Sequence, residues 1–392
     1  MWVLFLSLGS PVLPDARYLK MMLIASLAVY LIGLHSRPTW TTSTLALIGL
    51  QTVLLFWTIM SALANDVLVP QRIVLWSLAF FCCFALSRYG SSFLTTSFIR
   101  GGLITLSLGW ILTLGGRVPG LLTSSYGWLG LQYRFSGTLT SANAVGLLSL
   151  LIVVLLIRNN EVHKYWLTLP IISILGAEYR GGIIALATCA LWLGVKALQT
   201  NDSVRRLVAY IRLLVLVPVG LFVVRYLSSS RSGNGDATTG RGLIWQQCQN
   251  YIRHQSYFGG GPELIQRVVG TDTTASNSAT GSFQFFHCHN QVLNDTVNFG
   301  YIGMLLSLAL TVSLLLVAHR RRHIAFELLS IALLVAGLFE TPLNYLGVQG
   351  DLWPVVLVWS GLLTLCQISE KHYAPHRELE VGPDVTAIPG KV

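Results

Sequence analysis

The residues with the clearest chemical potential in this sequence are three arginines, each followed closely by glycine. Arg134, Arg180 and Arg241 lie in the stretches RFSG, YRGG and GRGL. A guanidinium group can hold a phosphate or carboxylate through two N–H groups at once, whereas a lysine offers only a point charge. A neighbouring glycine lets the backbone come close to a bulky anion. This combination predicts an anion-binding site.

A histidine and an asparagine stand just before a long apolar segment, in the stretch FHCHNQVLN. His289 is suited to take a proton from a hydroxyl group near neutral pH. Asn290 is suited to cap the helix that follows, because its side chain can accept a backbone N–H. His287 is expected to be a supporting residue. Since the two histidines have no second cluster of ligands nearby, the HCH spacing does not predict a metal site.

The elements that would position these residues are membrane-spanning helices. The 392 residues are 53% hydrophobic and 11% charged, which is outside the usual balance of a soluble domain. An α-helix needs about 20 apolar residues to cross a hydrocarbon core of roughly 30 Å. We therefore expect an all-α polytopic membrane protein with about 12 spans, the first a short one at the very start of the chain. The other spans are expected near residues 19–34, 43–62, 73–88, 98–116, 139–157, 165–177, 181–198, 209–226, 298–317, 324–340 and 352–368.

The basic residues orient this bundle in the membrane. Alternate connections carry basic clusters such as HRRRH at residues 319–323, and the positive-inside rule makes their side cytoplasmic. The three glycine-linked arginines and His289 then lie on the opposite, extracytoplasmic side. The net charge of +10 partly reflects this topology. No basic patch interleaved with aromatic residues predicts nucleic-acid binding.

One long connection is the only sizeable soluble part of the predicted architecture. In it, the stretch RGLIWQQCQNYIR has apolar residues at helical spacing and predicts an amphipathic helix. Trp245 in this helix could stack on a sugar or anchor the helix at the membrane surface. Cys248 and Cys288 could form a disulfide, although sequence alone does not show that they meet. The expected organisation is an N-terminal bundle over 1–226, this loop over 227–297, further helices over 298–368 and a cytoplasmic tail over 369–392.

Four segments together resemble the O-antigen ligase and O-antigen polymerase superfamily. They are RFSGTLTSANAVGLLSLL, EYRGGIIALAT, GRGLIWQQCQNYIRHQSYFGGGPE and HNQVLNDTVNFGYIGMLLSLAL, in the order and spacing of that superfamily. The resemblance implies a helical membrane glycosyltransferase that needs no metal or other cofactor. It implies a donor glycan carried on undecaprenyl diphosphate and an acceptor hydroxyl on the periplasmic side of the bacterial inner membrane.

The resemblance also assigns roles to individual residues. It implies that Arg180 and Arg241 bind the diphosphate and stabilise the leaving group, and that His289 is the general base. Arg134 and Asn143 match further family positions, where substrate contact is expected. Other candidates for substrate contact are Glu178, Trp245 and Asn290.

Two acidic residues near these positions leave alternatives open. Relatives often have a serine just ahead of the arginine where this chain reads EYR, so Glu178 could instead pair with an arginine. Glu340 is a second acid, at the outer end of a predicted span.

Three functions remain to be weighed. The moderate length and the single dominant outer segment favour a ligase, whose acceptor is the lipid A core oligosaccharide, over a polymerase, whose acceptor is a second lipid-linked glycan. A transporter is the rival class. We find no internal repeat, no matching pair of interrupted spans and no acidic residue in mid-membrane, which disfavours transport.

Overall fold

The computed structural model describes residues 42–65, 90–115, 122–124, 133–137, 141–198, 241–254, 257–261, 288–343 and 353–371, with single residues at 83, 86, 87, 139 and 264. The spans expected near 19–34 and 209–226, and the short one at the start, lie outside the described residues. So do His287, nearly all of the span at 73–88, and most of the loop at 227–297.

Four described helices are long and apolar enough to cross a membrane. They are α3 (Thr42–Ala64), α5 (Gly90–Leu114), α8 (Arg180–Leu198) and α12 (Gln291–Arg320), and they overlap the spans expected at 43–62, 98–116, 181–198 and 298–317. The described part of the chain is therefore mostly helical, with four candidate membrane spans. The count of 12 spans stays a prediction.

Three other apolar helices are shorter than the spans expected in their place, namely α6 (Ala142–Leu156), α7 (Thr168–Gly176) and α13 (Ile324–Gly337). Helix α14 (Trp353–Lys371) covers nearly all of the span expected at 352–368. In place of the span expected over 165–177, a 3-10 turn at Lys164–Leu167 precedes the nine residues of α7. Nine helical residues extend only about 14 Å, less than half of a bilayer core of about 30 Å. Apolar composition alone did not reveal this shortening.

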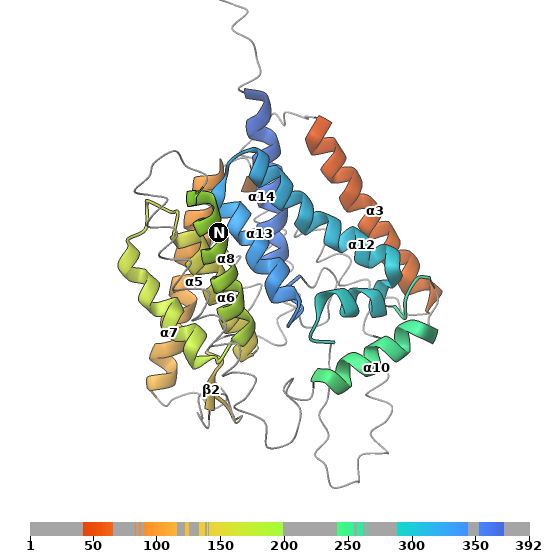
Figure 1. The fold of residues 1–392 in the computed structure, drawn as a ribbon, viewed down its shortest axis with the longest axis horizontal. Helices are drawn as coiled ribbons and strands as arrows, with labels where there is room; N and C mark the ends of the chain where they lie inside the picture. Colours follow the sequence, from red (N-terminus) through yellow and green to blue (C-terminus); the bar gives the residue numbers. More distant parts are fainter. Residues whose placement is uncertain are drawn as a thin grey trace, which may run out of the picture.

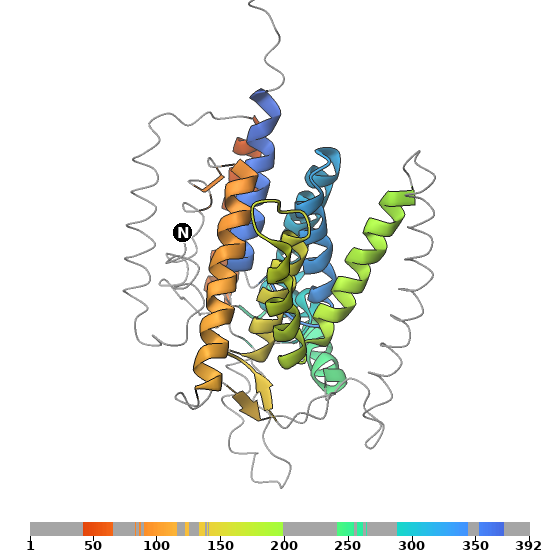
Figure 2. The same ribbon diagram turned by 90° about the vertical axis from the view of Figure 1, so that its left-hand side faces the viewer.

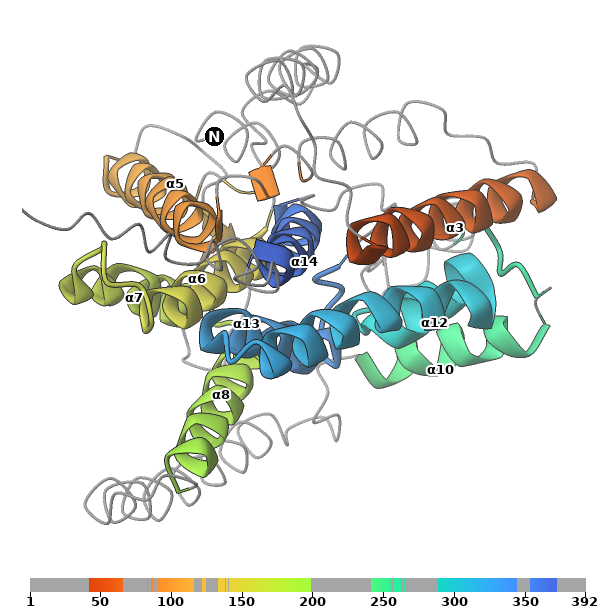
Figure 3. The same cartoon turned by 90° about the horizontal axis from the view of Figure 1, so that it is seen from above.

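Helix α13 lies at the centre of the arrangement. It packs against α6, α8 and α12, and Figure 3 shows these helices around it. Its side chains Phe326, Leu328 and Leu329 are fully buried. Because α13 is covered on several sides, the residues at its end are held in a fixed position. The turn that follows α13 contains Glu340, which belongs to the candidate site.

Helix α12 is broken at Gly300, where the backbone has φ 70° and ψ −176°. The carbonyls exposed by the break are bonded from outside the helix: Trp57 Nε1 of α3 donates to Phe299 O at 2.7 Å, and Gly261 N donates to Asn298 O at 3.0 Å. A Cβ at Gly300 would lie 1.9 Å from Tyr257 O. The glycine run at 259–261 is thus a packing surface for the broken helix.

A small two-stranded antiparallel hairpin is an addition to the all-α fold that the sequence predicts. Strand β1 (Leu122–Ser124) pairs with β2 (Tyr133–Phe135), and Thr123 lies opposite Arg134. Figure 2 shows the hairpin at one end of the bundle, where α10 (Arg241–His254) also lies. The pairing gives Arg134 a regular backbone in a segment expected to be a loop.

Candidate active site

His289 and Glu340 form the centre of the candidate site. Nδ1 of His289 lies 3.0 Å from Oε2 of Glu340, although the two residues are 51 positions apart. The glutamate side chain is 8% exposed and the histidine side chain 22%. A carboxylate beside Nδ1 favours the tautomer with the proton on Nδ1, which gives Nε2 the lone pair of a general base.

Asn143 and Arg134 extend this pair into a hydrogen-bonded chain. Asn143 Nδ2 donates to Glu340 Oε1 at 2.8 Å, and Arg134 Nη2 donates to Asn143 Oδ1 at 2.8 Å. Arg134 Nε also donates to the carbonyl of Ala177 at 2.9 Å. The structure therefore brings three predicted site residues together, from β2, α6 and the start of α12.

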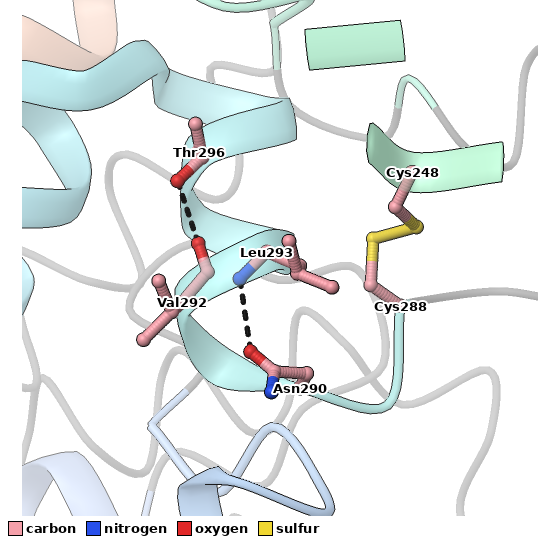
Figure 4. Close-up of a disulfide and its surroundings, with 6 residues drawn as sticks. All are labelled: Cys248, Cys288, Asn290, Val292, Leu293 and Thr296. Carbon is pink, nitrogen blue, oxygen red and sulfur yellow. Dashed lines mark hydrogen bonds between the residues drawn. A yellow bond between two sulfur atoms is a disulfide. The ribbon is translucent and has the colours of Figure 1, made fainter. Parts of the chain in front are cut away.

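Asn290 caps α12, as the sequence predicts. Its Oδ1 accepts from Leu293 N at 3.0 Å, which Figure 4 shows. Its Nδ2 donates to Leu338 O at 3.1 Å, and Gln291 bonds both the N–H and the carbonyl of Leu343, at 2.9 Å and 2.8 Å. Asn290 and Gln291 thus hold the chain on both sides of Glu340 against the beginning of α12. With both functional groups of its side chain bonded to the protein, Asn290 is a structural residue of the site.

Two residues of the candidate site have left-handed backbone conformations. Glu178 has φ 49° and His289 has φ 48°. Non-glycine residues adopt this region at a cost, and such conformations concentrate at functional sites. At both positions the chain turns sharply into a helix, and Glu178 is buried at 4% exposure just before α8.

Arg180 is the first residue of α8 and is half-buried. A positive side chain at the positive end of a helix dipole is unfavourable on its own and becomes favourable when an anion binds. The glycines after it have a packing role. A Cβ at Gly182 would lie 2.4 Å from Tyr179 Cδ1, and one at Gly146 of α6 would lie 2.3 Å from Tyr179 Cβ. The sequence suggests that the glycines after Arg180 let the backbone come close to an anion. In the structure, Gly182 instead makes room for the side chain of Tyr179.

Helix α10 begins at Arg241, as the sequence predicts, and has one buried face. Ile244 and Cys248 of this face pack with Cys288 and Val297, while Gln246, Gln247, Gln249 and Asn250 are exposed. Trp245 is half-buried, and its Nε1 has no hydrogen-bond partner among the described residues. The side chain of Arg241 lies outside the described part of the chain.

A disulfide joins Cys248 of α10 to Cys288, with 6.3 Å between the Cα atoms (Figure 4). Cys288 immediately precedes His289, so the bond ties the helix that begins at Arg241 to the candidate base. The sequence left this pairing open, and the structure shows it. A disulfide-bonded Cys288 offers no thiolate to a metal, which further weakens a metal site built on the HCH spacing.

Replacement of both Cys248 and Cys288 by alanine is expected to lower the free energy of unfolding by the amount that the disulfide contributes. This is the contribution that a reductant removes from the wild type. Closing a loop of 40 residues contributes about 2 to 4 kcal/mol to the free energy of unfolding. The measurement is the thermal unfolding midpoint in detergent, with and without dithiothreitol. The wild type should lose stability on reduction and the double variant should not respond. Cys189→Ala, which removes a buried free thiol, should respond like the wild type; an equal midpoint for the wild type in both conditions would contradict the prediction.

Two acids are buried near the starts of described helices, Asp295 in α12 and Glu327 in the first turn of α13, and neither stands in the middle of its helix. Asp295 of α12 is 3% exposed and accepts from Gln291 Nε2 at 2.8 Å and from Ser307 Oγ at 2.6 Å. Because these partners stand on opposite sides of Gly300, Asp295 braces the broken helix. Glu327 of α13 is fully buried and contacts Lys196 and His319, near the other ends of α8 and α12.

A cavity of about 270 Å³ lies between α12 and α13, beside the residues that hold Glu340 in place. Gln291, Leu338 and Leu343 belong to its lining. Most of the remaining lining is aliphatic, and Asp295, Ser307 and Thr311 contribute its polar part. The candidate site is therefore bordered by an apolar space within the membrane-spanning helices.

An apolar helical bundle with a histidine–glutamate pair at one end has the layout of a membrane enzyme that acts at the bilayer surface. Residues 165–308 match the family model described as O-antigen ligase, which confirms the resemblance to the O-antigen ligase and polymerase superfamily over these residues. The match supports an O-antigen ligase-like glycosyltransferase function in broad terms. A search of curated proteins found no match.

The matched residues contain the three predicted catalytic residues and leave out the rest of the hydrogen-bonded chain. Arg180, Arg241 and His289 lie within residues 165–308, whereas Arg134, Asn143 and Glu340 lie outside them. Sequence reasoning noted Glu340 only as an acid at the end of a span. The sequence shows that Glu340 stands three residues after the end of an apolar segment, at Gly337. It does not show that His289 is its partner.

Proposed function

We propose that this protein is a metal-independent inverting glycosyltransferase that moves a glycan from undecaprenyl diphosphate to an acceptor hydroxyl at the periplasmic face of a bacterial inner membrane. The ligase reaction, with the lipid A core oligosaccharide as acceptor, is the preferred form. The observation that carries the proposal is the contact between His289 Nδ1 and Glu340 Oε2 at 3.0 Å, at the entrance to a helix of the matched segment.

The contact supports a defined proton transfer. Nε2 of His289 accepts the proton of the acceptor hydroxyl while its oxygen forms a bond to the anomeric carbon of the donor sugar. The bond from that carbon to the diphosphate oxygen breaks, and the diphosphate leaves with the electron pair. Attack from the side opposite the leaving group inverts the anomeric configuration. Glu340 stabilises the imidazolium ion that results.

The leaving diphosphate needs positive charge near it. Arg180 and Arg241 begin α8 and α10, and the disulfide ties α10 to the residue before His289. Guanidinium groups that are fixed in place before the reaction stabilise charge that develops on the leaving group. The apolar cavity of about 270 Å³ between α12 and α13 suits a part of the lipid carrier.

The same donor chemistry would serve a polymerase, and the acceptor separates the two forms. Transport remains the rival class, and the buried acids Asp295 and Glu327 are the groups that a transporter would have to use. However, Asp295 accepts from Gln291 and Ser307, and Glu327 contacts Lys196 and His319, so both acids are parts of bonded networks. The site at His289 has no evident use in a transporter.

Purified protein in detergent tests the function directly, because transport across a membrane cannot produce a reaction product there. The assay supplies undecaprenyl diphosphate-linked oligosaccharide with either lipid A core or a second portion of the lipid-linked oligosaccharide, in buffer with EDTA. Glycosylated lipid A core indicates a ligase. Lengthened lipid-linked glycan indicates a polymerase and overturns the ligase form. No product in EDTA but product with added divalent metal overturns the metal-independent mechanism, and no product in any condition overturns the glycosyltransferase.

A further inference from the structure

The chain of hydrogen bonds behind His289 has a direction that the donor and acceptor groups determine. Arginine can only donate, so Nη2 of Arg134, at 2.8 Å, requires the carbonyl oxygen of the Asn143 amide to face it. The NH₂ group of the same amide then faces Glu340, where Nδ2 lies 2.8 Å from Oε1. Arg134 therefore selects one of the two possible orientations of the Asn143 amide.

The orientation of this amide in turn decides which atom of Glu340 faces Nδ1 of His289. With Oε1 of Glu340 held by Asn143, the second oxygen, Oε2, lies at His289 Nδ1. An oxygen at Nδ1 favours the tautomer in which Nε2 can accept a proton. Arg134 is itself anchored, since its Nε donates to the carbonyl of Ala177 at 2.9 Å.

The backbone that carries Glu340 is held independently of Asn143. Asn290 bonds Leu338 O and Gln291 bonds Leu343 through both functional groups of its amide. A change at Asn143 therefore leaves the main-chain anchors of the Glu340 turn in place. Its consequence should fall on the Glu340 side chain and, through it, on His289.

We propose that Asn143 and Arg134 are positioning residues that set the tautomer of His289 through Glu340. The resemblance had implied instead that these two residues contact the substrate. The inference rests on the proposed function, because it needs His289 as the base of the transfer reaction. It concerns residues that lie outside the segment matched by the family model.

The sharpest experiment exchanges the acid and the amide between positions 143 and 340. In Glu340→Gln alone, the new amide oxygen should stay with Asn143 Nδ2 and the new NH₂ group should face His289 Nδ1, which imposes the wrong tautomer. Adding Asn143→Asp gives that NH₂ group an acceptor, so the amide can turn its oxygen to His289. The new carboxylate at position 143 still accepts from Arg134.

We expect the double variant to transfer glycan at least about 10-fold faster than Glu340→Gln, the lower end of the range for residues that orient a catalytic group. Asn143→Asp alone and Asn143→Ala should lower kcat on the order of 10- to 100-fold, with little change in KM for the undecaprenyl diphosphate-linked oligosaccharide. A double variant no faster than Glu340→Gln overturns the proposal. A raised KM for the donor with unchanged kcat in Asn143→Ala overturns it too, in favour of substrate contact.

Asn159 offers a matched control near the other end of α6. It is 7% exposed, donates from Nδ2 to Thr96 Oγ1 at 2.7 Å, and accepts from Glu161 N at 2.8 Å. Asn159→Ala should lower stability but leave kcat of the folded protein unchanged, which separates a structural loss from a loss of positioning. The proposed function fails in a different way, namely if the wild-type protein forms no product with either acceptor. A fully active His289→Ala variant would instead refute His289 as the general base. An active His289→Asn variant would have the same meaning, and this variant keeps a residue that tolerates the left-handed backbone at φ 48°.

Discussion

Replacement of His289 by alanine is expected to lower kcat for glycan transfer by about 10²- to 10⁴-fold, the range that general-base catalysis contributes. The physical reason is that the acceptor hydroxyl would lose the group that takes its proton as the new glycosidic bond forms. Donor binding should change little, because His289 is proposed to act on the acceptor side. The measurement is the initial rate of transfer to the lipid A core, with the KM for the lipid-linked donor determined in parallel.

Two further variants make this prediction decisive. His289→Asn keeps a side chain that tolerates φ 48°, so a loss of activity in it does not reflect backbone strain. His254→Ala removes an exposed histidine from the last turn of α10 and should be as active as the wild type. A wild-type kcat in the His289→Ala variant would refute the proposal that His289 is the general base.

Replacement of Glu340 by glutamine is expected to lower kcat by a factor in the upper part of the same range, about 10³- to 10⁴-fold. A similar loss follows when the orienting acid of a serine–histidine–aspartate triad becomes an amide. The change keeps the size of the side chain and removes its charge. Asn143 Nδ2 holds the oxygen, so an N–H group would face His289 Nδ1 and Nε2 would carry the proton. The measurement is kcat under saturating donor and acceptor.

Glu327 provides a matched control for this substitution. It is a buried glutamate that also contacts a histidine, with 2.8 Å between His319 Nδ1 and its Oε1, but it belongs to a cluster with Lys196 at the other end of α13. Glu327→Gln should lower thermal stability and leave kcat of the folded enzyme unchanged. If Glu340→Gln behaved in the same way, the contact with His289 would be structural and the proposed tautomer control would be refuted.

Several features of the site could be predicted because they depend on neighbours in the sequence. Asn290 caps α12 because an asparagine before an apolar segment can accept a backbone N–H within its own first turn. Arg241 begins α10 because apolar residues at helical spacing follow it. The predicted spans at 43–62 and 181–198 match α3 and α8 closely because a run of apolar residues itself marks a helix of that length.

Other features could not be predicted because the composition of a segment does not show where tertiary packing ends, extends or breaks a helix. Helix α7 has nine residues where a full span was expected, and α12 begins at Gln291, seven residues before its expected start at 298. The glycines after Arg180 suited an anion, yet Gly182 makes room for Tyr179. The role of the glycine run at 259–261 became visible only beside the break at Gly300, where Figure 1 shows α12 turning.

The sequence by itself indicated that this chain is a helical membrane protein, that Arg241 and Asn290 stand at helix starts, and which arginines and histidine belong to the superfamily pattern. Only the tertiary structure decided that His289 meets Glu340 across 51 positions, that Asn143 reaches Glu340 across 197, and that Cys248 bonds Cys288. The reason is physical. A helix forms from bonds between residues four positions apart, whereas a hydrogen bond of about 3 Å between distant side chains requires both helices to have packed with the correct faces together.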